Sequence, residues 1–433
     1  MPEAPGEETR QAILRSAEEL IEEAVDFLRQ LIQVPTVNPP GAAYIKCATT
    51  MGEHLRKLGY AIEYVELTGG EVAELAPYGE GQPRMNVIGR LQGQSAGPVL
   101  HFNGHMDVVP PGSGWSTDPF GGEVRDQRIY GRGASDMKGG LAAQVYAVEA
   151  IRRAGLRLLG SVEQSGTVDE ESTGKRNAGV GLLVERGYIA PECTNYVVIT
   201  EPLNVDNICL GHRGALWGEI RTFGRQAHGS TPVKGVNALE HMAGFIAEAT
   251  RQLGPRLQQR QNQHPVVPPE ANAASLAFTM IQGGTNVNSV PDTCVVAFDR
   301  RLVTGERLED ARQELRQILE QQARDVSDFR YEYKERYAAA PTWVSAETPL
   351  VQAFRSAVST VLGREPGYVC SPGTDDQRFV VQNAGIEQCI VYGPGEITQA
   401  HITDESLAIA DLLASIQVMA LATATLLGVE EEK

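Results

Sequence analysis

Residues 101–140 read HFNGHMDVVPPGSGWSTDPFGGEVRDQRIYGRGASDMKGG, and this stretch carries the clearest structural signal in the chain. The apolar run VLHF at 99–102 predicts a strand, and the helical spacing of apolar residues over 139–154 predicts a helix. A strand joined to a helix by a loop is the unit from which α/β folds are built. We therefore expect an α/β sheet whose polar side chains lie in the loops after its strands.

Outward from this stretch, short apolar strands alternate with amphipathic helices. Strands are expected at 61–67, 85–91, 158–164 and 196–200, and helices at 12–33, 48–58 and 139–154. A further helix near 348–362 and a strand near 389–392 continue the pattern toward the C-terminus. This order predicts an α/β sheet covered by helices on both faces.

A different order of elements interrupts the α/β pattern. Between residues 212 and 336 the predicted elements run strand, helix, strand, strand, helix, strand, which is the ferredoxin-like arrangement. We expect a larger α/β domain formed by 1–211 and 337–433, with an α+β domain at 212–336 inserted into it. A chain of 433 residues is long enough for two hydrophobic cores.

Charge and composition narrow the classes of partner. Acidic residues outnumber basic ones by 55 to 38, and the net charge of −17 disfavours nucleic acid and anionic membrane surfaces as partners. The N-terminus lacks a signal-peptide pattern and no stretch approaches about 18 consecutive apolar residues, so we expect no membrane span. The six cysteines form no C-x-x-C pair, and we interpret them as reduced thiols of a cytoplasmic protein.

Ionisable side chains recur at the ends of the predicted strands and in one glycine-rich turn. They are His105, Asp107, Asp136, the run Asp169–Glu171, Glu201 and His401. Taken singly, each has an ordinary structural explanation, and Asp136 could cap the helix that begins near Gly139. Open α/β sheets place their ligand sites at strand ends, and neutral imidazole is a common metal ligand. Together these residues indicate one polar site.

Eight motifs in a fixed order resemble the metal-dependent family that includes acetylornithine deacetylase, succinyl-diaminopimelate desuccinylase, aminoacylase and glutamate carboxypeptidase. The motifs are GHMDVVP, YGRGASDMKGG, DEE, TEP, AHGSTPVKGVNA, NSVPD with DRR, GTDD and AHITDE. The resemblance runs from about residue 34 to the end of the chain. It implies a three-layer, metallopeptidase-like catalytic domain with an inserted lid and dimerisation domain, and a homodimer formed through that inserted domain.

The resemblance implies two divalent metal ions. His105 and Glu201 would hold one ion, Glu171 and His401 the other, and Asp136 would bridge them. Two histidines and three carboxylates form a mixed nitrogen and oxygen ligand set that suits Zn²⁺ and would also accept Mn²⁺ or Co²⁺.

The resemblance also implies catalytic roles. Glu170 would be the general base, because a carboxylate beside an activated water can take its proton and pass it to the departing nitrogen. Asp107 would orient His105, and His228 would reach the active site of the partner subunit to stabilise the oxyanion. Spacing alone does not separate Glu170 from Glu171, and the assignment follows the family's order.

Four further positions match family residues near the substrate. They are Asn288, Arg301, Gly373 and Thr374. In an alternating strand, Asp299 and Arg301 should share one face and Arg300 should lie on the other. The run 372–379, PGTDDQRF, departs from the family's G-G-T-D-x-R-F, so the exact substrate stays open.

We therefore expect a metal-dependent hydrolase that cleaves an amide-type C–N bond of a small, carboxylate-bearing molecule, either an N-acyl amino acid or a C-terminal amino acid conjugate. Two alternatives are a hydrolytic deaminase of an amino-substituted aromatic acid and a non-catalytic metal- or ligand-binding descendant. A serine hydrolase is disfavoured, because the G-x-S-x-G run at 93–97 is followed by Pro98 and a strand instead of a helix.

Overall fold

The chain forms two compact units in a computed structural model that describes residues 5–79, 81–171 and 177–432. The first unit comprises 1–211, 344–369 and 375–433, and the second comprises 212–343 and 370–374. The second unit thus extends to residue 343, beyond the predicted 336, because β13 (Arg330–Ala339) continues to Ala339 and β14 (Thr342–Trp343) follows it.

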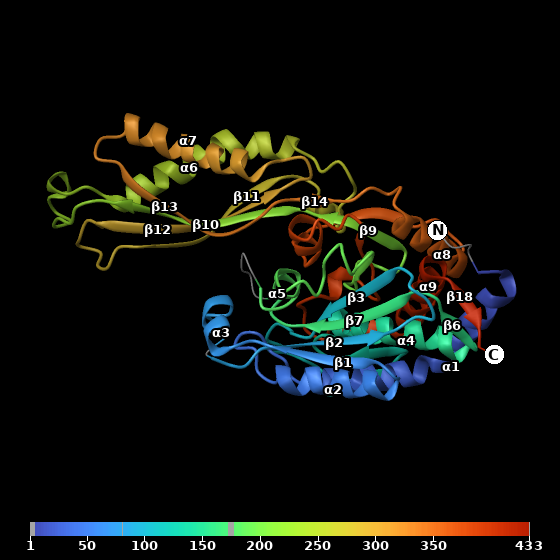
Figure 1. The fold of residues 1–433 in the computed structure, drawn as a ribbon. Helices are drawn as coiled ribbons and strands as arrows, with labels where there is room; N and C mark the ends of the chain where they lie inside the picture. The colour runs from blue at the N-terminus through green and yellow to red at the C-terminus, as the bar shows by residue number, and fades with distance from the viewer. Residues whose placement is uncertain (1–4, 80, 172–176, 433) are drawn as a thin grey trace. The chain divides into compact units, whose positions relative to one another are not determined.

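The first unit is built on a mixed sheet in which strands distant in sequence lie side by side (Figure 1). Its strands include, in order, β1 (Ala61–Glu66), β2 (Met85–Leu91), β7 (Ser161–Thr167), β3 (Val99–His105), β8 (Tyr196–Ile199), β16 (Cys389–Val391) and β9 (Asn207–His212), and β15 (Gly367–Ser371) also pairs with β9. Strands β7, β3, β8 and β16 pair in parallel. Their carboxyl ends therefore meet at one edge of the sheet, where α/β folds bind ligands.

Helices of the first unit pack against this sheet and against one another. They are α1 (Glu7–Ile32), α2 (Tyr44–Lys57), α3 (Gly69–Leu75), α4 (Gly139–Arg153), α5 (Val180–Glu185), α8 (Pro349–Leu362) and α9 (Ile409–Leu427). Helices α1, α4, α8 and α9 form one packed group, and α2 packs on β1 and β2. By length and composition alone α9 could cross a membrane, which the sequence analysis did not anticipate. Most of α9 is buried, however, as in the core helix of a soluble protein.

Short strand pairings join distant parts of the first unit at two places. Strand β5 (Arg128–Tyr130) pairs with β4 (Glu123–Arg125) on one side and with β17 (Ser406–Ala408) on the other. Strand β6 (Leu156–Leu158) pairs with β18 (Val429–Glu431). The C-terminal segment is thereby joined to the long loop that precedes α4. The G-x-S-x-G run is the connection between β2 and β3 and opens no helix.

The glycine pair that begins α4 allows a close backbone approach. A Cβ atom at Gly140 would lie 2.0 Å from the Thr200 carbonyl oxygen, and one at Gly139 would lie 2.6 Å from the Ala134 carbonyl oxygen. The turn Ala134–Lys138 can therefore pack against the end of β8. This approach brings Asp136 toward the residues that follow β8.

The second unit is a four-stranded antiparallel sheet covered by two helices (Figure 1). In chain order its elements are β10 (Gly214–Phe223), α6 (Ala238–Gln259), β11 (Ser275–Gly283), β12 (Thr293–Leu302), α7 (Leu308–Asp325) and β13 (Arg330–Ala339). The sheet order is β11-β12-β10-β13, and its core lies between the sheet and the helices around Phe245, Phe298 and Leu315. The predicted α/β fold with an inserted ferredoxin-like unit is confirmed.

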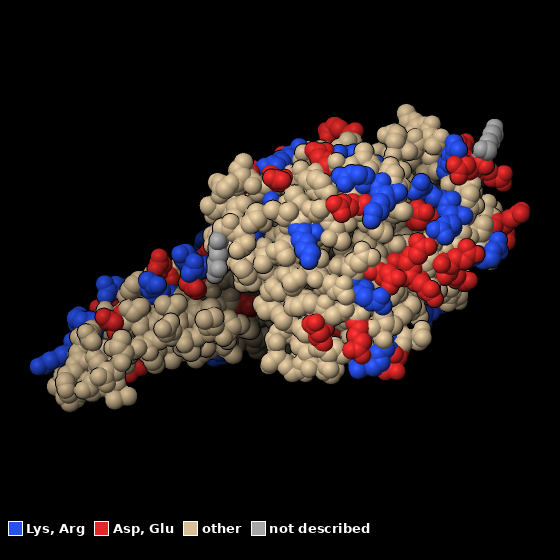
Figure 2. Space-filling view, turned by 90° about the horizontal axis from the view of Figure 1, so that it is seen from below, with Lys and Arg blue, Asp and Glu red and all other residues tan. Residues whose placement is uncertain are grey.

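Charged side chains of both signs are interspersed over the face that Figure 2 shows. Exposed ion pairs, such as Arg355 with Glu365 at 2.6 Å and Arg186 with Glu71 at 2.5 Å, place opposite charges side by side. Such pairs contribute little to stability. The first unit also contains ion pairs that are shielded from water, such as Arg84 with Asp169.

Candidate metal centre

The carboxyl ends of four adjacent parallel strands place the predicted ligands together. His105 is the last residue of β3, Glu171 follows β7, and Glu201 follows β8. His401 lies in the segment after β16. The remaining ligand, Asp136, belongs to the turn before α4 and does not cap that helix, because the residue at the N-cap is Lys138 and no side chain caps it.

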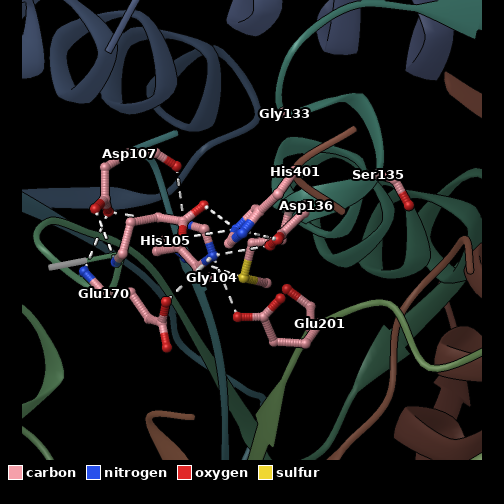
Figure 3. Close-up of polar contacts among 12 residues, drawn as sticks. Gly104, His105, Asp107, Gly133, Ser135, Asp136, Glu170, Glu201 and His401 are labelled. Atoms are coloured by element: carbon pink, nitrogen blue, oxygen red, sulfur yellow. Dashed lines mark hydrogen bonds and ion pairs between the residues drawn. The ribbon is translucent and has the colours of Figure 1, made fainter. Parts of the chain in front are cut away.

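Two groups of three ligand atoms share Asp136 (Figure 3). In the first group, His105 Nε2 lies 3.3 Å from Asp136 Oδ1 and 3.2 Å from Glu201 Oε1. In the second, His401 Nε2 lies 3.3 Å from Asp136 Oδ2 and 3.0 Å from Glu171 Oε2. The two oxygens of Asp136 thus face different histidines, which is the geometry of a bridging carboxylate.

The donor atoms of these groups suit divalent cations. Each group offers one imidazole nitrogen and two carboxylate oxygens within 4.8 Å of one another. His105 Nε2 is buried and makes no hydrogen bond, although two carboxylates lie beside it. A nitrogen aimed at carboxylates in this way is arranged as a ligand, and nitrogen with oxygen donors fits Zn²⁺, Mn²⁺ or Co²⁺.

Burial and crowding shift the pKa values of the acidic groups in the centre. Burial raises the pKa of Glu201 to about 8, opposed by His105 and reinforced by the charge of Asp136. Burial also raises the pKa of Glu171. Hydrogen bonds to Asp136 and Glu171 raise the pKa of His401 to about 10. A buried cluster of carboxylates is costly unless cations neutralise it, so the electrostatics favour bound metal ions.

Glu170 lies beside the centre without belonging to either ligand group. Its Oε2 is 3.9 Å from His105 Nε2, and burial raises its pKa well above the ordinary value for a glutamate. A carboxyl group whose pKa is raised by burial holds a proton more readily than an ordinary glutamate and can exchange it with a reacting group. Its position and its environment therefore suit proton transfer.

Asp107 contacts three parts of the centre. Its carboxylate accepts hydrogen bonds from the backbone N–H groups of Glu170 at 3.3 Å and Glu171 at 3.1 Å. His105 Nδ1 lies 2.9 Å from the Asp107 carbonyl oxygen and 3.7 Å from its carboxylate. The carbonyl can therefore hold the Nδ1–H, which leaves Nε2 unprotonated toward the ligand groups. The carboxylate instead fixes the Glu170–Glu171 backbone.

A buried polar network behind Asp107 was missed by the sequence analysis. The Asn38 amide donates to Asp107 at 3.0 Å and to Asp169 at 3.2 Å. Asp169 also accepts from Tyr44 at 3.0 Å and from Arg84 Nε at 2.8 Å, and Arg84 and Asp169 are fully buried. The first residue of the DEE motif, flagged only as one of three carboxylates, therefore anchors the two glutamates that follow it.

Two of the remaining predicted residues lie on neighbouring loops of the second unit. His228 and Ser289 pair in an isolated antiparallel β-bridge, and the Asn288 carbonyl oxygen accepts a hydrogen bond from the Gly229 backbone N–H at 2.6 Å. The backbone N–H of Ser230 donates to His228 Nδ1 at 3.1 Å. Nδ1 is thus an acceptor, so the neutral ring carries its proton on Nε2.

Arg301 and Thr374 are linked through two aromatic residues of the second unit. The predicted alternation holds, since Arg301 Nε contacts Asp299 at 2.9 Å while Arg300 is buried on the other face. The Arg301 guanidinium lies 5.2 Å from the Trp217 ring centroid, and Trp217 packs against Tyr337. The Tyr337 hydroxyl lies 2.8 Å from Thr374 Oγ1. Gly373 precedes Thr374 in the same segment.

Neither aromatic residue was identified from the sequence. Both residues lie in strands, and Trp217 pairs with Tyr337 across β10 and β13. This pairing depends on which strands become neighbours, so the sequence alone does not reveal it.

A protein-family profile matches most of the chain. The profile for peptidase family M20/M25/M40 aligns with residues 101–425. Among curated relatives, succinyl-diaminopimelate desuccinylase of Dechloromonas aromatica is 30% identical over 392 residues, covering 89% of this chain and 93% of that protein. The enzyme of the same name from Gluconacetobacter diazotrophicus is 31% identical over 415 residues, covering 94% and 97%.

Solved structures share the fold over almost the whole chain. Human carnosine dipeptidase 1 superposes with a TM-score of 0.75 at 17% identity, covering 98% of this chain and 99% of that one. An M20 family metallo-carboxypeptidase from Sulfolobus solfataricus gives 0.72 at 20% identity, covering 93% and 99%. A dinuclear metal-binding peptidase of the M20 family from Bacillus subtilis gives 0.67 at 16% identity, covering 94% and 99%.

Proposed function

This chain belongs to peptidase family M20/M25/M40, and from that premise we propose that it removes a carboxylate-bearing acyl group, such as succinyl, from the nitrogen of an amino acid. The resemblance inferred from the sequence motifs is confirmed. The chain is a metal-dependent hydrolase of amide C–N bonds in small N-acyl amino acid or peptide substrates. The proposal concerns the narrower choice among these substrates and the residues that act on them.

One observation carries the mechanism. The two ligand groups share Asp136 through its two oxygens, while the carboxyl group of Glu170, whose side chain is 16% exposed, lies next to them and belongs to neither group. The centre takes two metal ions, and its mixed donor set leads us to propose Zn²⁺ as the resident ion. Mn²⁺ and Co²⁺ are accommodated by the same donors.

The chemistry follows from the positions of the side chains. The bound ions would lower the pKa of the attacking water and polarise the scissile carbonyl group. Glu170 accepts the proton of that water and returns it to the nitrogen as the C–N bond breaks. Asp107 holds the Glu170 backbone and, through its own carbonyl, the His105 ring. These contacts keep the base and the ligand in a fixed relation.

His228 is proposed as the donor to the oxyanion. Because its Nδ1 accepts from Ser230, its Nε2–H is free to donate without the ring being charged. Loss of one such donor typically lowers the rate by about 10²–10³-fold. We further propose that His228 acts in the partner subunit of a homodimer. The exposed apolar side chains of Met280 and Ile281 on the edge strand β11 support an association surface on the second unit.

The choice of an anionic acyl group rests on two supports. The curated relatives named above are succinyl-diaminopimelate desuccinylases. Arg301 is the second support, because its Nε donates to Asp299 and its guanidinium lies over the Trp217 ring, 5.2 Å from the centroid. A guanidinium positioned by such contacts is suited to binding carboxylates, and Asn288, Gly373 and Thr374 are further proposed substrate contacts.

We place the enzyme in the cytoplasm. The six cysteines all lie among the described residues and form no disulfide bond, and five of them are buried. Cysteines without disulfide bonds are typical of proteins in a reducing compartment.

A hydrolysis screen tests the proposed function. Purified, Zn²⁺- or Mn²⁺-loaded protein would be incubated with N-acetyl and N-succinyl amino acids, C-terminal amino acid conjugates and amino-substituted aromatic acids, and products identified by mass spectrometry. We expect the N-succinyl amino acids of this panel to be hydrolysed with release of the free amino acid, and we expect a chelator to abolish this release. Release of ammonia from the aromatic acids would instead identify a deaminase. No turnover in any metal form would contradict the proposal.

A further inference from the structure

Glu405 is a fully buried carboxylate that receives four hydrogen bonds from one turn of the chain. Its Oε2 accepts from Arg132 Nη1 at 2.6 Å and from the backbone N–H of Gly133 at 3.1 Å. Its Oε1 accepts from the backbone N–H groups of Ser135 at 2.9 Å and Asp136 at 3.0 Å. The acceptor capacity of this carboxylate is therefore used almost entirely on the turn that carries the shared ligand.

The same residue belongs to the loop that carries His401, so it joins two ligand-bearing segments from opposite ends of the sequence. The Glu405 carbonyl accepts from the Gly131 backbone N–H at 3.0 Å. The neighbouring Asp404 carboxylate accepts from the Ser116 backbone N–H at 2.8 Å. Figure 3 shows Asp136, the ligand carried by this turn, beside His401. The contact is thus local to the metal centre.

Arg132 and Glu405 form a buried ion pair. Its side chain is 2% exposed and that of Glu405 is 0% exposed. The guanidinium also lies 5.4 Å from the Trp115 ring centroid, which covers it. A charge-assisted hydrogen bond shielded from water is strong, and its loss leaves a buried charge unpaired. The turn therefore has one strongly preferred conformation.

We propose that Glu405 is a positioning residue of the metal centre, which fixes the Asp136 carboxylate relative to the His401 ring before any ion binds. Each oxygen of Asp136 must face a different histidine, so a small rotation of the turn would spoil both ligand groups at once. Three of the four hydrogen bonds to Glu405 come from the backbone of this turn and resist that rotation. The inference rests on the ligand roles proposed above for Asp136 and His401.

The test substitutes Glu405→Gln and measures Zn²⁺ affinity of the metal-free protein by competition with a chromophoric chelator. The amide has the shape of the carboxylate, but its NH₂ group cannot accept the hydrogen bonds of Arg132 and Gly133. We expect about 10–100-fold weaker Zn²⁺ binding, the range typical for loss of a residue that orients metal ligands. This measurement needs no substrate and no turnover.

A matched control separates positioning from general stability. Glu306 in the second unit accepts from Arg300 Nη2 at 2.6 Å, and Arg300 is 1% exposed. It also accepts from the Val303 backbone N–H at 2.9 Å. Glu306→Gln should lower the unfolding temperature as Glu405→Gln does, yet leave Zn²⁺ affinity unchanged. Glu405→Asp, which keeps the charge, should fold even where the glutamine variant does not, and bind Zn²⁺ with intermediate affinity.

Two results would overturn the inference. One is wild-type Zn²⁺ affinity in both Glu405 variants, and the other is equal weakening by Glu306→Gln. A different result would contradict the proposed function: the wild-type protein would bind two Zn²⁺ ions but hydrolyse none of the substrates.

Discussion

At the scale of single residues, position alone separates the carboxylates that we propose as metal ligands from the one that we propose as the base. Asp136, Glu171 and Glu201 each lie within 3.3 Å of a histidine nitrogen, whereas Glu170 approaches no closer than 3.9 Å. The adjacent residues Glu170 and Glu171 therefore differ in their neighbours, which their spacing in the sequence could not reveal.

Glu170→Gln should lower kcat by about 10²–10⁴-fold, because the amide cannot take a proton from the attacking water. Bound metal, counted by mass spectrometry of the metal content, should stay at the wild-type level. Glu171→Gln is the neighbouring control and should lose metal. Near-normal turnover in Glu170→Gln would refute its assignment as the base.

Asp107 shows how far residue roles can be predicted from a motif. The His-x-Asp spacing predicts that Asp107 contacts His105, and it does so mainly through its carbonyl oxygen. Its carboxylate binds the backbone of residues about sixty positions later, at Glu170 and Glu171. The contacts of Glu405 are likewise long-range. No local pattern encodes such contacts, because they depend on which strands become neighbours.

At the scale of elements, the loop after β7 is held by the buried pair of Arg84 and Asp169. Arg84→Met would leave Asp169 buried without its cation, and breaking such a pair costs about 3–5 kcal/mol of unfolding free energy. Arg355, whose side chain is 47% exposed, pairs with Glu365 at 2.6 Å. Arg355→Met should cost about 0–1 kcal/mol. Urea unfolding of both variants would measure the difference, and equal costs would show that burial of the first pair is unimportant.

The contact between α1 and α2 predicts a pH effect on stability. The His54 ring stacks on Phe27 with centroids 3.9 Å apart, and burial, with help from Lys57, lowers the pKa of His54 from 6.5 to about 4. Between these values the unfolded chain binds a proton that the folded chain does not, so stability falls as pH falls from 6.5 toward 4.

His54→Leu removes this titration and should flatten the pH dependence by less than about 1.4 kcal/mol per pH unit, since the ring is partly exposed. Thermal unfolding of the metal-free protein at pH 5 and pH 7 measures the difference. An unchanged slope in the variant would contradict the lowered pKa.

Most of the longer elements could be predicted, but the long helix α9 and short elements such as β17 could not. Helix α9 is apolar on almost all of its faces, so it lacks the amphipathic period on which a helix prediction depends. Strand β17 has three residues and exists only because β5 lies beside it. Helices with one polar face, such as α2 and α8, were located to within a few residues.

At the scale of the whole molecule, the proposed homodimer makes a prediction that a monomer does not. If His228 acts in the partner's active site, then mixing His228→Ala with Glu170→Gln should restore activity. In a mixed dimer, one site would combine an intact Glu170 with an intact His228. Random exchange of subunits in a symmetric dimer should give about one quarter of wild-type activity. Activity no greater than the sum of the separate variants would place His228 in its own subunit's site or outside the mechanism.

The central claim is that two ions, held by groups sharing Asp136, are required for amide hydrolysis. The most direct measurement adds Zn²⁺ stepwise to metal-free protein and records bound zinc and release of amino acid from an N-succinyl amino acid in the same samples. We predict that the protein binds two ions per chain, that hydrolysis appears only as they bind, and that Asp136→Ala loses both ion binding and hydrolysis. Full hydrolysis by the metal-free protein, or normal zinc binding by Asp136→Ala, would contradict the account.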